Sequence, residues 1–166
     1  MNTDHCHTCE LVIRRDTGDA PLWDRIYRTQ YWDAAHAFNV ALPGWLVLVS
    51  RHHIAAVDEM SQAEAIELGI LLRDVSIALK QVVGCEKTYV MQFAESADHP
   101  HVHFHIVPRM ADQPEDKKGP KIFGYMGSGE IQVSDEVMNG LAAAIQPILA
   151  SQFSDTNPAD FLTRGS

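Results

Sequence analysis

The sequence has no apolar run that approaches the length of a membrane-spanning helix, and it is poor in positive charge. Thirteen Lys and Arg residues stand against 22 Asp and Glu residues, so the formal net charge is −9 with the nine histidines counted as neutral. Neither a nucleic acid nor an anionic membrane attracts such a surface, and we expect neither as a partner. The polar start at residues 1–5 does not resemble a signal peptide, and we therefore expect a cytoplasmic protein.

Cysteine is also scarce, with three residues in the whole chain. Two of them form the motif Cys6-His7-Thr8-Cys9, and Cys85 stands alone near the end of an expected helix. In a reducing compartment a Cys-x-x-Cys pair is more often metal-binding or redox-active than a structural disulfide. We therefore expect Cys6 and Cys9 to have a role in metal or redox chemistry, and Cys85 to be inert.

The chain has 46% apolar residues, enough for the core of one domain. Ser61 with Glu64 forms a capping box, and apolar residues at helical spacing follow, which predicts a helix from about 61 to 83. Composition also predicts four strands before the most distinctive segment of the chain, at about 26–31, 32–40, 45–49 and 88–93.

After residue 109 the composition changes. Residues 110–129 are rich in Lys, Asp, Pro and Gly, which is typical of a mobile loop or arm. Ser134 or Asp135 can then begin a helix that runs to about residue 152, with an interruption near Pro147. Strands and helices are segregated along the chain rather than alternating, and this favours an α+β fold with an antiparallel sheet.

Imidazoles recur at every second position from residue 101 to residue 105, with apolar residues between them. That is the period of a β-strand, so His101, His103 and His105 are expected on one face and the apolar side chains on the other. From the residues alone, three interpretations remain open. The imidazoles are metal ligands, or a nucleophile with its acid–base helpers, or surface histidines without a role.

The segment from His101 to Val107 (HVHFHIV), followed by Pro108-Arg109, resembles the signature of the histidine triad (HIT) family, in which three histidines alternate with apolar residues. The resemblance covers about residues 5–109. It implies a five-stranded antiparallel sheet backed by a long helix, to which we add the expected C-terminal helix, and it implies a homodimer. We expect a HIT domain over 1–109, with 110–166 forming a C-terminal arm and helix of the same domain.

The resemblance also implies a mechanism. The middle histidine of the triad, here His103, would attack the α-phosphorus of a nucleotide and form a nucleotidyl-imidazole intermediate, which water or another acceptor then resolves. Neutral imidazole suits this role because it is both a good nucleophile and a good leaving group near pH 7. His105 would donate a hydrogen bond to the phosphoryl oxygens, and Gln92 matches a family glutamine that contacts phosphate or the leaving-group oxygen.

For the rest of the substrate, Asn39 matches the residue that binds the ribose hydroxyls, and Phe38 would line the base pocket. The loop after Gln92 lacks the glycines that relatives have there, and Ser96 is its candidate hydrogen-bond donor to phosphate. Trp45 stands where the family commonly has a histidine, so whatever that histidine contributes is absent from this chain.

Zinc is implied by the same resemblance. Some bacterial relatives hold it with an N-terminal Cys-x-x-Cys, a histidine after the Pro-Gly strand and the first histidine of the triad. Here these are Cys6, Cys9, His53 and His101, and the metal would be structural. We choose His53 over its neighbour because an apolar residue follows it, as in the family. The alternative is a metal-free thiol pair.

We therefore expect a nucleotide hydrolase that cleaves at the α-phosphate of a dinucleoside polyphosphate or a nucleoside phosphoramidate. Related uridylyltransferases have glutamine at the position of His105, which favours hydrolysis over transfer. The alternatives are a nucleotidyltransferase of the same superfamily, a nucleotide-binding or interaction module with little turnover, and a zinc-dependent regulator that uses Cys6 and Cys9 as a sensor.

Overall fold

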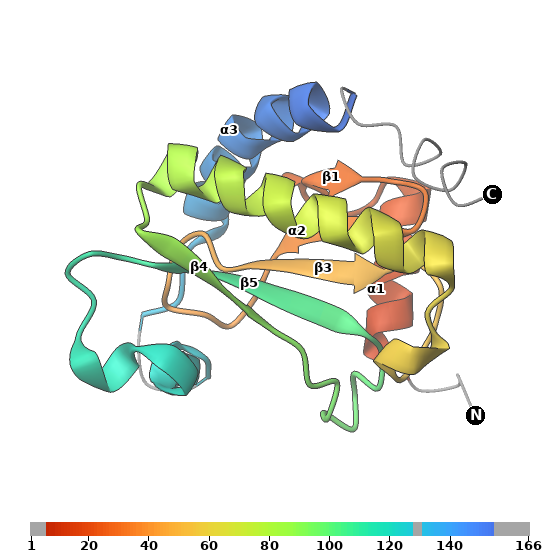
Figure 1. Ribbon diagram of the computed structural model, residues 1–166, viewed down its shortest axis with the longest axis horizontal. Helices are drawn as coiled ribbons and strands as arrows, with labels where there is room; N and C mark the ends of the chain where they lie inside the picture. Colours follow the sequence, from red (N-terminus) through yellow and green to blue (C-terminus); the bar gives the residue numbers. More distant parts are fainter. Residues whose placement is uncertain (1–5, 128–130, 155–166) are drawn as a thin grey trace.

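The computed structural model describes residues 6–127 and 131–154. Its centre is one antiparallel sheet in the order β1-β2-β3-β5-β4 (Figure 1). The strands are β1 (Tyr27–Arg28), β2 (Trp32–His36), β3 (Leu46–Ser50), β4 (Lys87–Met91) and β5 (His103–Arg109). The helices are α1 (His7–Thr17), α2 (Gln62–Val83) and α3 (Asp135–Ser154), joined by short 3-10 helices at Leu22–Asp24 (η1), Val57–Glu59 (η2), Glu115–Lys117 (η3) and Gly119–Tyr125 (η4). The expected α+β class with a five-stranded antiparallel sheet is confirmed.

The two faces of the sheet differ because side chains alternate along each strand. On one face the apolar residues of β3 and β5 pack against α2, which lies across the sheet in Figure 1. These residues are Leu46, Leu48, Phe104 and Ile106. On the opposite face Val47 lies across from His105, and Val49 lies across from His103. His103 and His105 therefore lie on the face that α2 does not cover, whereas His101 precedes β5.

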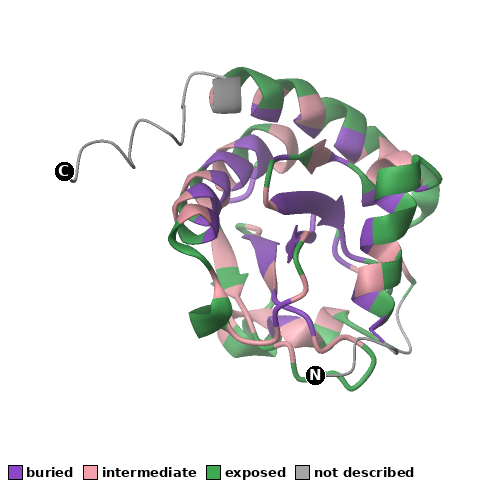
Figure 2. Ribbon diagram, turned by 90° about the vertical axis from the view of Figure 1, so that its right-hand side faces the viewer, coloured by how far each residue is buried: buried purple, intermediate pink, exposed green. Residues whose placement is uncertain are grey.

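Helix α2 begins and ends as the sequence predicts. The Ser61 hydroxyl accepts a hydrogen bond from the Glu64 amide at 3.2 Å, and the Glu64 carboxylate accepts one from the Ser61 amide at 2.7 Å. Gly84 ends the helix in the left-handed conformation, with φ of 69°. Figure 2 shows the buried residues gathered toward the inside of the molecule and the exposed ones on the outer sides of the helices.

Helix α3 packs on α2, where Ala142, Ile145 and Leu149 are fully buried. The expected interruption near Pro147 is wrong, because α3 continues through that residue to Ser154. Among the described residues, no helix is long and apolar enough to cross a membrane. The cytoplasmic location and the division of the chain at residue 109 stay predictions.

Helix α1 is not predicted by the sequence pattern. The apolar residues Leu11, Val12 and Ile13 are contiguous, which does not mark one face of a helix. In the structure they spread around α1, with Val12 buried and Ile13 exposed. Gly18, with φ of 81°, ends the helix and donates its amide to the carbonyl of Arg15 at 3.3 Å.

Two further expectations need correction. The strand expected over 26–31 shrinks to Tyr27–Arg28, because residues 29–32 form a turn in which the Thr29 amide bonds the Trp32 carbonyl at 2.9 Å. The arm expected after residue 109 folds against the sheet, and Ile122 of η4 is fully buried in a second apolar cluster that includes Trp45 and Val107.

Candidate active site and metal centre

A cavity of about 340 Å³ lies over the face of the sheet that α2 leaves uncovered. His103 and His105 of β5 line it together with Val47 and Val49 of β3. Its walls come from α1, from the loop that follows β4, and from the segment around η4, which contributes Phe123. Three segments that are distant in sequence therefore close around the two imidazoles, and they contribute both apolar and polar side chains.

The ring of His103 is held by the backbone of its own strand. Its Nδ1 lies 2.7 Å from the carbonyl oxygen of His101, and a carbonyl can only accept, so Nδ1 carries the proton and donates it. In the neutral ring the other nitrogen, Nε2, then keeps its lone pair. His103 lines the cavity, and this arrangement leaves a nucleophilic nitrogen available there.

His105 has the opposite tautomer. The indole Nε1–H of Trp45 donates to Nδ1 of His105 at 3.0 Å, so the proton of the neutral His105 ring is on Nε2. Burial, with the neighbouring His103 ring, lowers the pKa of His105 to about 4. With both rings neutral, the cavity therefore contains one imidazole with a free lone pair and a second imidazole that offers an N–H donor, and the two ring centroids are 5.0 Å apart.

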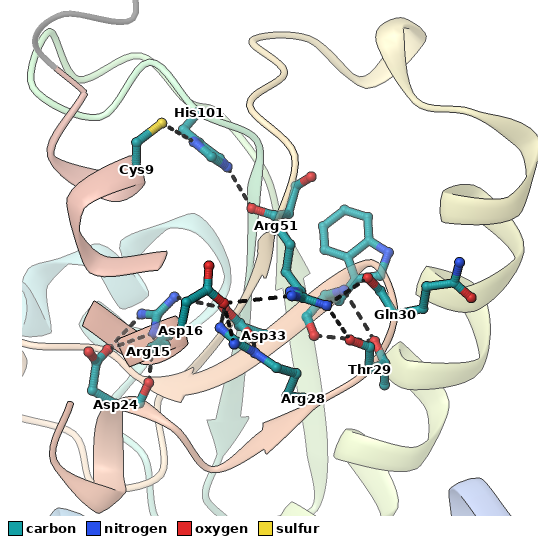
Figure 3. A network of polar contacts seen from close by, with 12 residues as sticks. Cys9, Arg15, Asp16, Asp24, Arg28, Thr29, Gln30, Asp33, Arg51 and His101 are labelled. Atoms are coloured by element: carbon teal, nitrogen blue, oxygen red, sulfur yellow. Dashed lines mark hydrogen bonds and ion pairs between the residues drawn. The ribbon is translucent and has the colours of Figure 1, made fainter. Parts of the chain in front are cut away.

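His101 faces away from this cavity and toward the N-terminal cysteines. Its Nε2–H donates to the carbonyl of Ser50 at 2.7 Å, which leaves the lone pair on Nδ1. That nitrogen lies 3.7 Å from Sγ of Cys6 and 3.5 Å from Sγ of Cys9. Burial lowers the pKa of His101 to about 4, so the ring is neutral near pH 7 and can act as a ligand. Figure 3 shows the contact between Cys9 and His101.

The residues present fit a tetrahedral zinc ion. The ligand atoms of Cys6, Cys9, His53 and His101 all lie within 4.8 Å of one another. Cys9 Sγ and His53 Nδ1 are 3.1 Å apart. Zinc bonds of ordinary length place sulfur and nitrogen ligands about 3.5 Å apart, close to these separations. Burial and the adjacent Cys6 thiol raise the pKa of Cys9 to about 11, so two thiolates at this place require a cation to compensate them.

The first turn of α1 brings the two cysteines to this cluster. Cys6 is the residue that caps the helix, and Cys9 follows in the first turn, its amide bonded to the Cys6 carbonyl at 3.0 Å. Free amides at a helix N-terminus stabilise negative charge, which suits thiolate ligands. The backbone of His7 also bonds the carbonyl of Asp98 at 2.9 Å, so α1 is attached to the loop that precedes β5.

The other end of α1 is attached to the sheet by ion pairs (Figure 3). Arg15 donates from Nη2 to Oδ1 of Asp24 at 2.6 Å and from Nε to the Asp24 carbonyl at 2.7 Å. Its Nη1 lies 3.7 Å from a carboxylate oxygen of Asp33, which also accepts from Arg28. The Arg15 and Asp24 side chains are each 3% exposed. These buried ion pairs hold α1 in its position beside the cavity.

Three large apolar side chains are exposed at the cavity, beside the exposed Glu95 and Ser96. Phe38 is 39% exposed, Phe93 is 56% exposed and Met126 is 37% exposed, and all three line the cavity. His99 also lies there, with Nδ1 2.8 Å from the hydroxyl of Thr8 on α1. Exposed aromatic rings beside a cavity are suited to hold a flat, weakly polar group such as a base.

The structure brings some of the predicted binding residues to the cavity and leaves others away from it. Phe38 and Ser96 line the cavity. Gln92 is not among the lining residues; it follows Met91, which ends β4 and lies opposite His105 in the register. Phe93 lines the cavity. The contact of Gln92 with phosphate stays a prediction.

Asn39 also lies outside the cavity lining. It is exposed, and its left-handed backbone, with φ of 54°, serves a turn in which its carbonyl accepts from the Gly127 amide at 3.0 Å. Asparagine tolerates this conformation better than most residues, which gives Asn39 a structural reason to be there. Its expected contact with ribose has no support in the described structure.

Sequence reasoning missed two groups that shape the site. Phe123 lies in the segment expected to be a loop, and no local signal marks it as a cavity residue. Trp45 was noted only for the histidine that it replaces. Its position directly after Pro43-Gly44, at the start of a strand that pairs with β5, was the signal that it could contact the triad.

No sequence-family model matches the chain, and no curated protein matches it in sequence. Solved structures do match. A zinc-bound histidine triad family protein from Mycobacterium smegmatis has a TM-score of 0.62 at 16% identity, over 91% of this chain and 97% of that one. A hypothetical histidine triad nucleotide-binding protein from Sulfolobus tokodaii has a TM-score of 0.65 at 18% identity, over 88% and 93%.

A diadenosine triphosphate hydrolase from Plasmodium falciparum is similar as well, with a TM-score of 0.58 at 17% identity over 77% of each chain. The sheet, the helices and the row of alternating histidines thus define the chain as a protein of the histidine triad fold. The resemblance noted in the sequence is confirmed at the level of that fold.

Proposed function

We propose that this protein is a nucleotide hydrolase that cleaves at the α-phosphate through a nucleotidyl-histidine intermediate on His103. One observation carries the proposal. His103 donates its Nδ1–H to a backbone carbonyl, while the neighbouring His105 keeps its proton on Nε2, so a nucleophile and a hydrogen-bond donor line one cavity. That pair is what an attack on phosphorus requires.

In the first step Nε2 of His103 attacks the α-phosphorus, and the bond from phosphorus to the leaving oxygen or nitrogen breaks. His105 donates from Nε2–H to a nonbridging phosphoryl oxygen, where negative charge increases. In the second step water attacks the same phosphorus, and the electron pair of the P–N bond returns to His103. The apolar wall of Val47 and Val49 keeps bulk water from the back of the site.

The nucleoside part of the substrate would lie along the exposed apolar side chains of the cavity. Phe38 and Phe93 are exposed aromatic rings at the cavity, and a base can stack on either of them. Ser96 is a hydroxyl donor on the loop after β4 and would contact the phosphates. The known hydrolase among the structural neighbours acts on diadenosine triphosphate, which supports a dinucleoside polyphosphate as the first substrate to test.

We also propose that the cluster of Cys6, Cys9, His53 and His101 holds a structural zinc ion. Four protein ligands would fill the tetrahedral coordination of zinc, so the ion would attach α1 to the sheet and would take no part at phosphorus. The zinc-bound neighbour supports this assignment. His103, two residues from His101, would be positioned by the same attachment.

A homodimer is proposed from the resemblance alone. Strand β4 is an outer strand of the sheet, and Val90 on it is 45% exposed, which is compatible with an interface there. Light scattering on the purified protein gives the mass directly, and a monomer at micromolar concentration would contradict this part.

The test of function is product analysis by ion-exchange chromatography. Wild type, His103→Ala and His52→Ala would be incubated with diadenosine polyphosphates, adenosine phosphoramidate and a sugar–nucleotide pair. His52 is the matched control because it is an exposed histidine outside the cavity. Release of a mononucleotide by wild type and His52→Ala, but not by His103→Ala, is the expected result. Binding without turnover by all three proteins would contradict the proposal and favour a binding module.

A further inference from the structure

Trp45 directly precedes β3 and is fully buried. The only polar group of its side chain is the indole Nε1–H. That indole Nε1–H lies 3.0 Å from Nδ1 of His105, with the two rings nearly perpendicular at 88° and their centroids 5.7 Å apart. Phe123 packs against both rings. The contact is thus a directed hydrogen bond inside an apolar surround, and a buried bond of this kind fixes the ring that accepts it.

An indole N–H donates and never accepts. While Trp45 occupies Nδ1 of His105, that nitrogen cannot carry a proton, so the ring is held as the Nε2–H tautomer. The residues packed around the ring offer no charge that would favour a cation. Val47 and Met91 lie opposite it on the two neighbouring strands, Phe123 packs against it, and the ring of His103 is the titratable group that lowers its pKa besides burial.

We propose that Trp45 is a positioning residue that locks His105 as a fixed N–H donor and blocks proton relay through it, so that the site cleaves phosphoanhydride bonds in preference to phosphoramidate bonds. This inference rests on the proposed function. It concerns the leaving group, which the fold and the triad do not specify.

The chemistry follows from where the protons are. When Nε2 of His103 attacks phosphorus, the bond to the leaving group breaks and its electron pair goes to the departing atom. A phosphate oxygen departs as a stable anion and needs no proton. An amine nitrogen needs a proton. If His105 gave up its Nε2 proton, Nδ1 would have to receive another from Trp45, and the indole nitrogen has no lone pair with which to take a replacement. His105 could therefore supply the proton only by becoming an imidazolate.

Two variants separate the donor from the bulk of the indole. Trp45→Phe keeps an aromatic ring but removes the N–H, and Trp45→His offers an imidazole, in which one nitrogen donates while the other accepts and the proton can change places. Trp32→Phe is the matched control. It also removes a buried indole N–H, which here bonds the backbone carbonyl of Glu64 at 3.0 Å, on a side of the sheet away from His105.

The kinetic readout is the ratio of kcat/KM for diadenosine tetraphosphate to that for adenosine 5′-phosphoramidate. Wild type and Trp32→Phe should favour the anhydride at least tenfold, and Trp45→His should reduce this preference by tenfold or more. A loss of stability would lower both rates together and leave the ratio unchanged. Equal rates on the two substrates in wild type, or a ratio that neither Trp45 variant changes, would overturn the inference.

Nitrogen-15 NMR of the histidine rings reports the tautomer without any turnover. Wild type should show His105 protonated on Nε2 alone, and Trp45→Phe should show a mixture of tautomers or the other tautomer. A proton on Nδ1 of His105 in wild type would overturn the role of Trp45. If wild type cleaves neither substrate, the proposed function fails together with the leaving-group preference, while the NMR result still decides whether Trp45 locks the ring.

Discussion

The backbone carbonyl of His101 accepts the Nδ1–H of His103 at 2.7 Å, while the His101 side chain turns to the cysteines of α1. One residue therefore belongs to both sites. Its ring is a candidate metal ligand, and its carbonyl sets the tautomer of the nucleophile. Displacement of His101 would disturb the attachment of α1 and the orientation of His103 at the same time, which makes the metal cluster a means of ordering the active site.

Loss of a metal ligand should lower stability more than it changes the chemistry at phosphorus. We expect Cys6→Ser to reduce bound zinc well below one ion per chain and to lower Tm by several degrees, because ligand loss removes part of the metal's contribution to folding. Elemental analysis and thermal melting measure both quantities.

The control for this experiment is Cys85→Ser. Cys85 is buried in the main core away from the cluster, so this variant should keep its zinc even if its Tm falls. The zinc assignment would be refuted if wild type contained no metal and Cys6→Ser had the same Tm as wild type.

The buried ion pair of α1 gives a second prediction. Arg15→Leu should lower the free energy of unfolding by about 3–5 kcal/mol, because it leaves the buried carboxylate of Asp24 without the cation that pairs with it, whereas Asp33 keeps Arg28. Arg14→Leu is the matched control, one position earlier and exposed, and should change stability by less than about 0.5 kcal/mol. Urea unfolding of the two variants measures this free energy. Equal decreases for Arg15→Leu and Arg14→Leu would show that the buried ion pair of Arg15 does not stabilise the fold.

The loop after β4 gives a third prediction. Ala94 has a left-handed backbone, with φ of 54°, which is costly for a residue with a Cβ atom. Ala94→Gly should therefore raise the free energy of unfolding by up to about 1 kcal/mol. Ala97→Gly, in the same exposed loop without a positive φ, should instead lower stability or leave it unchanged. If both substitutions destabilise the protein equally, Ala94 is not strained.

The fourth prediction concerns pH. The pKa of His105 is about 4 in the folded protein, below its ordinary value of 6.5, because of burial and then the adjacent His103 ring. Below pH 6.5 the unfolded chain takes up a proton that the folded ring refuses, so stability is full above that pH and falls as pH drops toward 4. This one group should account for a loss of up to about 3 kcal/mol.

The measurement is the pH dependence of urea unfolding for wild type and for His105→Gln. Other groups titrate in the same range, so the quantity of interest is the difference between the two curves. The variant should be relatively more stable at pH 4.5 than at pH 7, compared with wild type. Parallel curves would show that His105 is not held in its neutral form.

The sequence pattern predicted helix α2 and the common face of His103 and His105, because these depend on local alternation and capping, whereas the five-stranded sheet was implied by the family resemblance. The pattern failed for α1, where Leu11, Val12 and Ile13 are adjacent and tertiary contacts through Arg15 and the cysteines decide the conformation. Gln92 lies outside the cavity lining for a related reason. A shift of one residue in a strand changes the face on which a side chain lies, and the sequence did not fix the end of β4 to that precision.

For Trp45 the sequence pattern indicated a position near the triad but not the hydrogen bond that its indole makes. An aromatic residue at the start of a buried strand is ordinary core, and only the register of β3 against β5 shows that its N–H meets His105. The same holds for Phe123, which reaches the cavity from a segment whose composition is typical of a loop.

The most direct test of the account is the mass of the protein during turnover. Wild type and His103→Ala would be mixed with diadenosine triphosphate, quenched in alkaline denaturant to preserve a P–N bond, and analysed by intact-protein and peptide mass spectrometry. We predict a single nucleotidyl group on His103 in wild type and none in the variant. Turnover by wild type without an adduct, or an adduct on another residue, would contradict the assignment of His103 as the nucleophile.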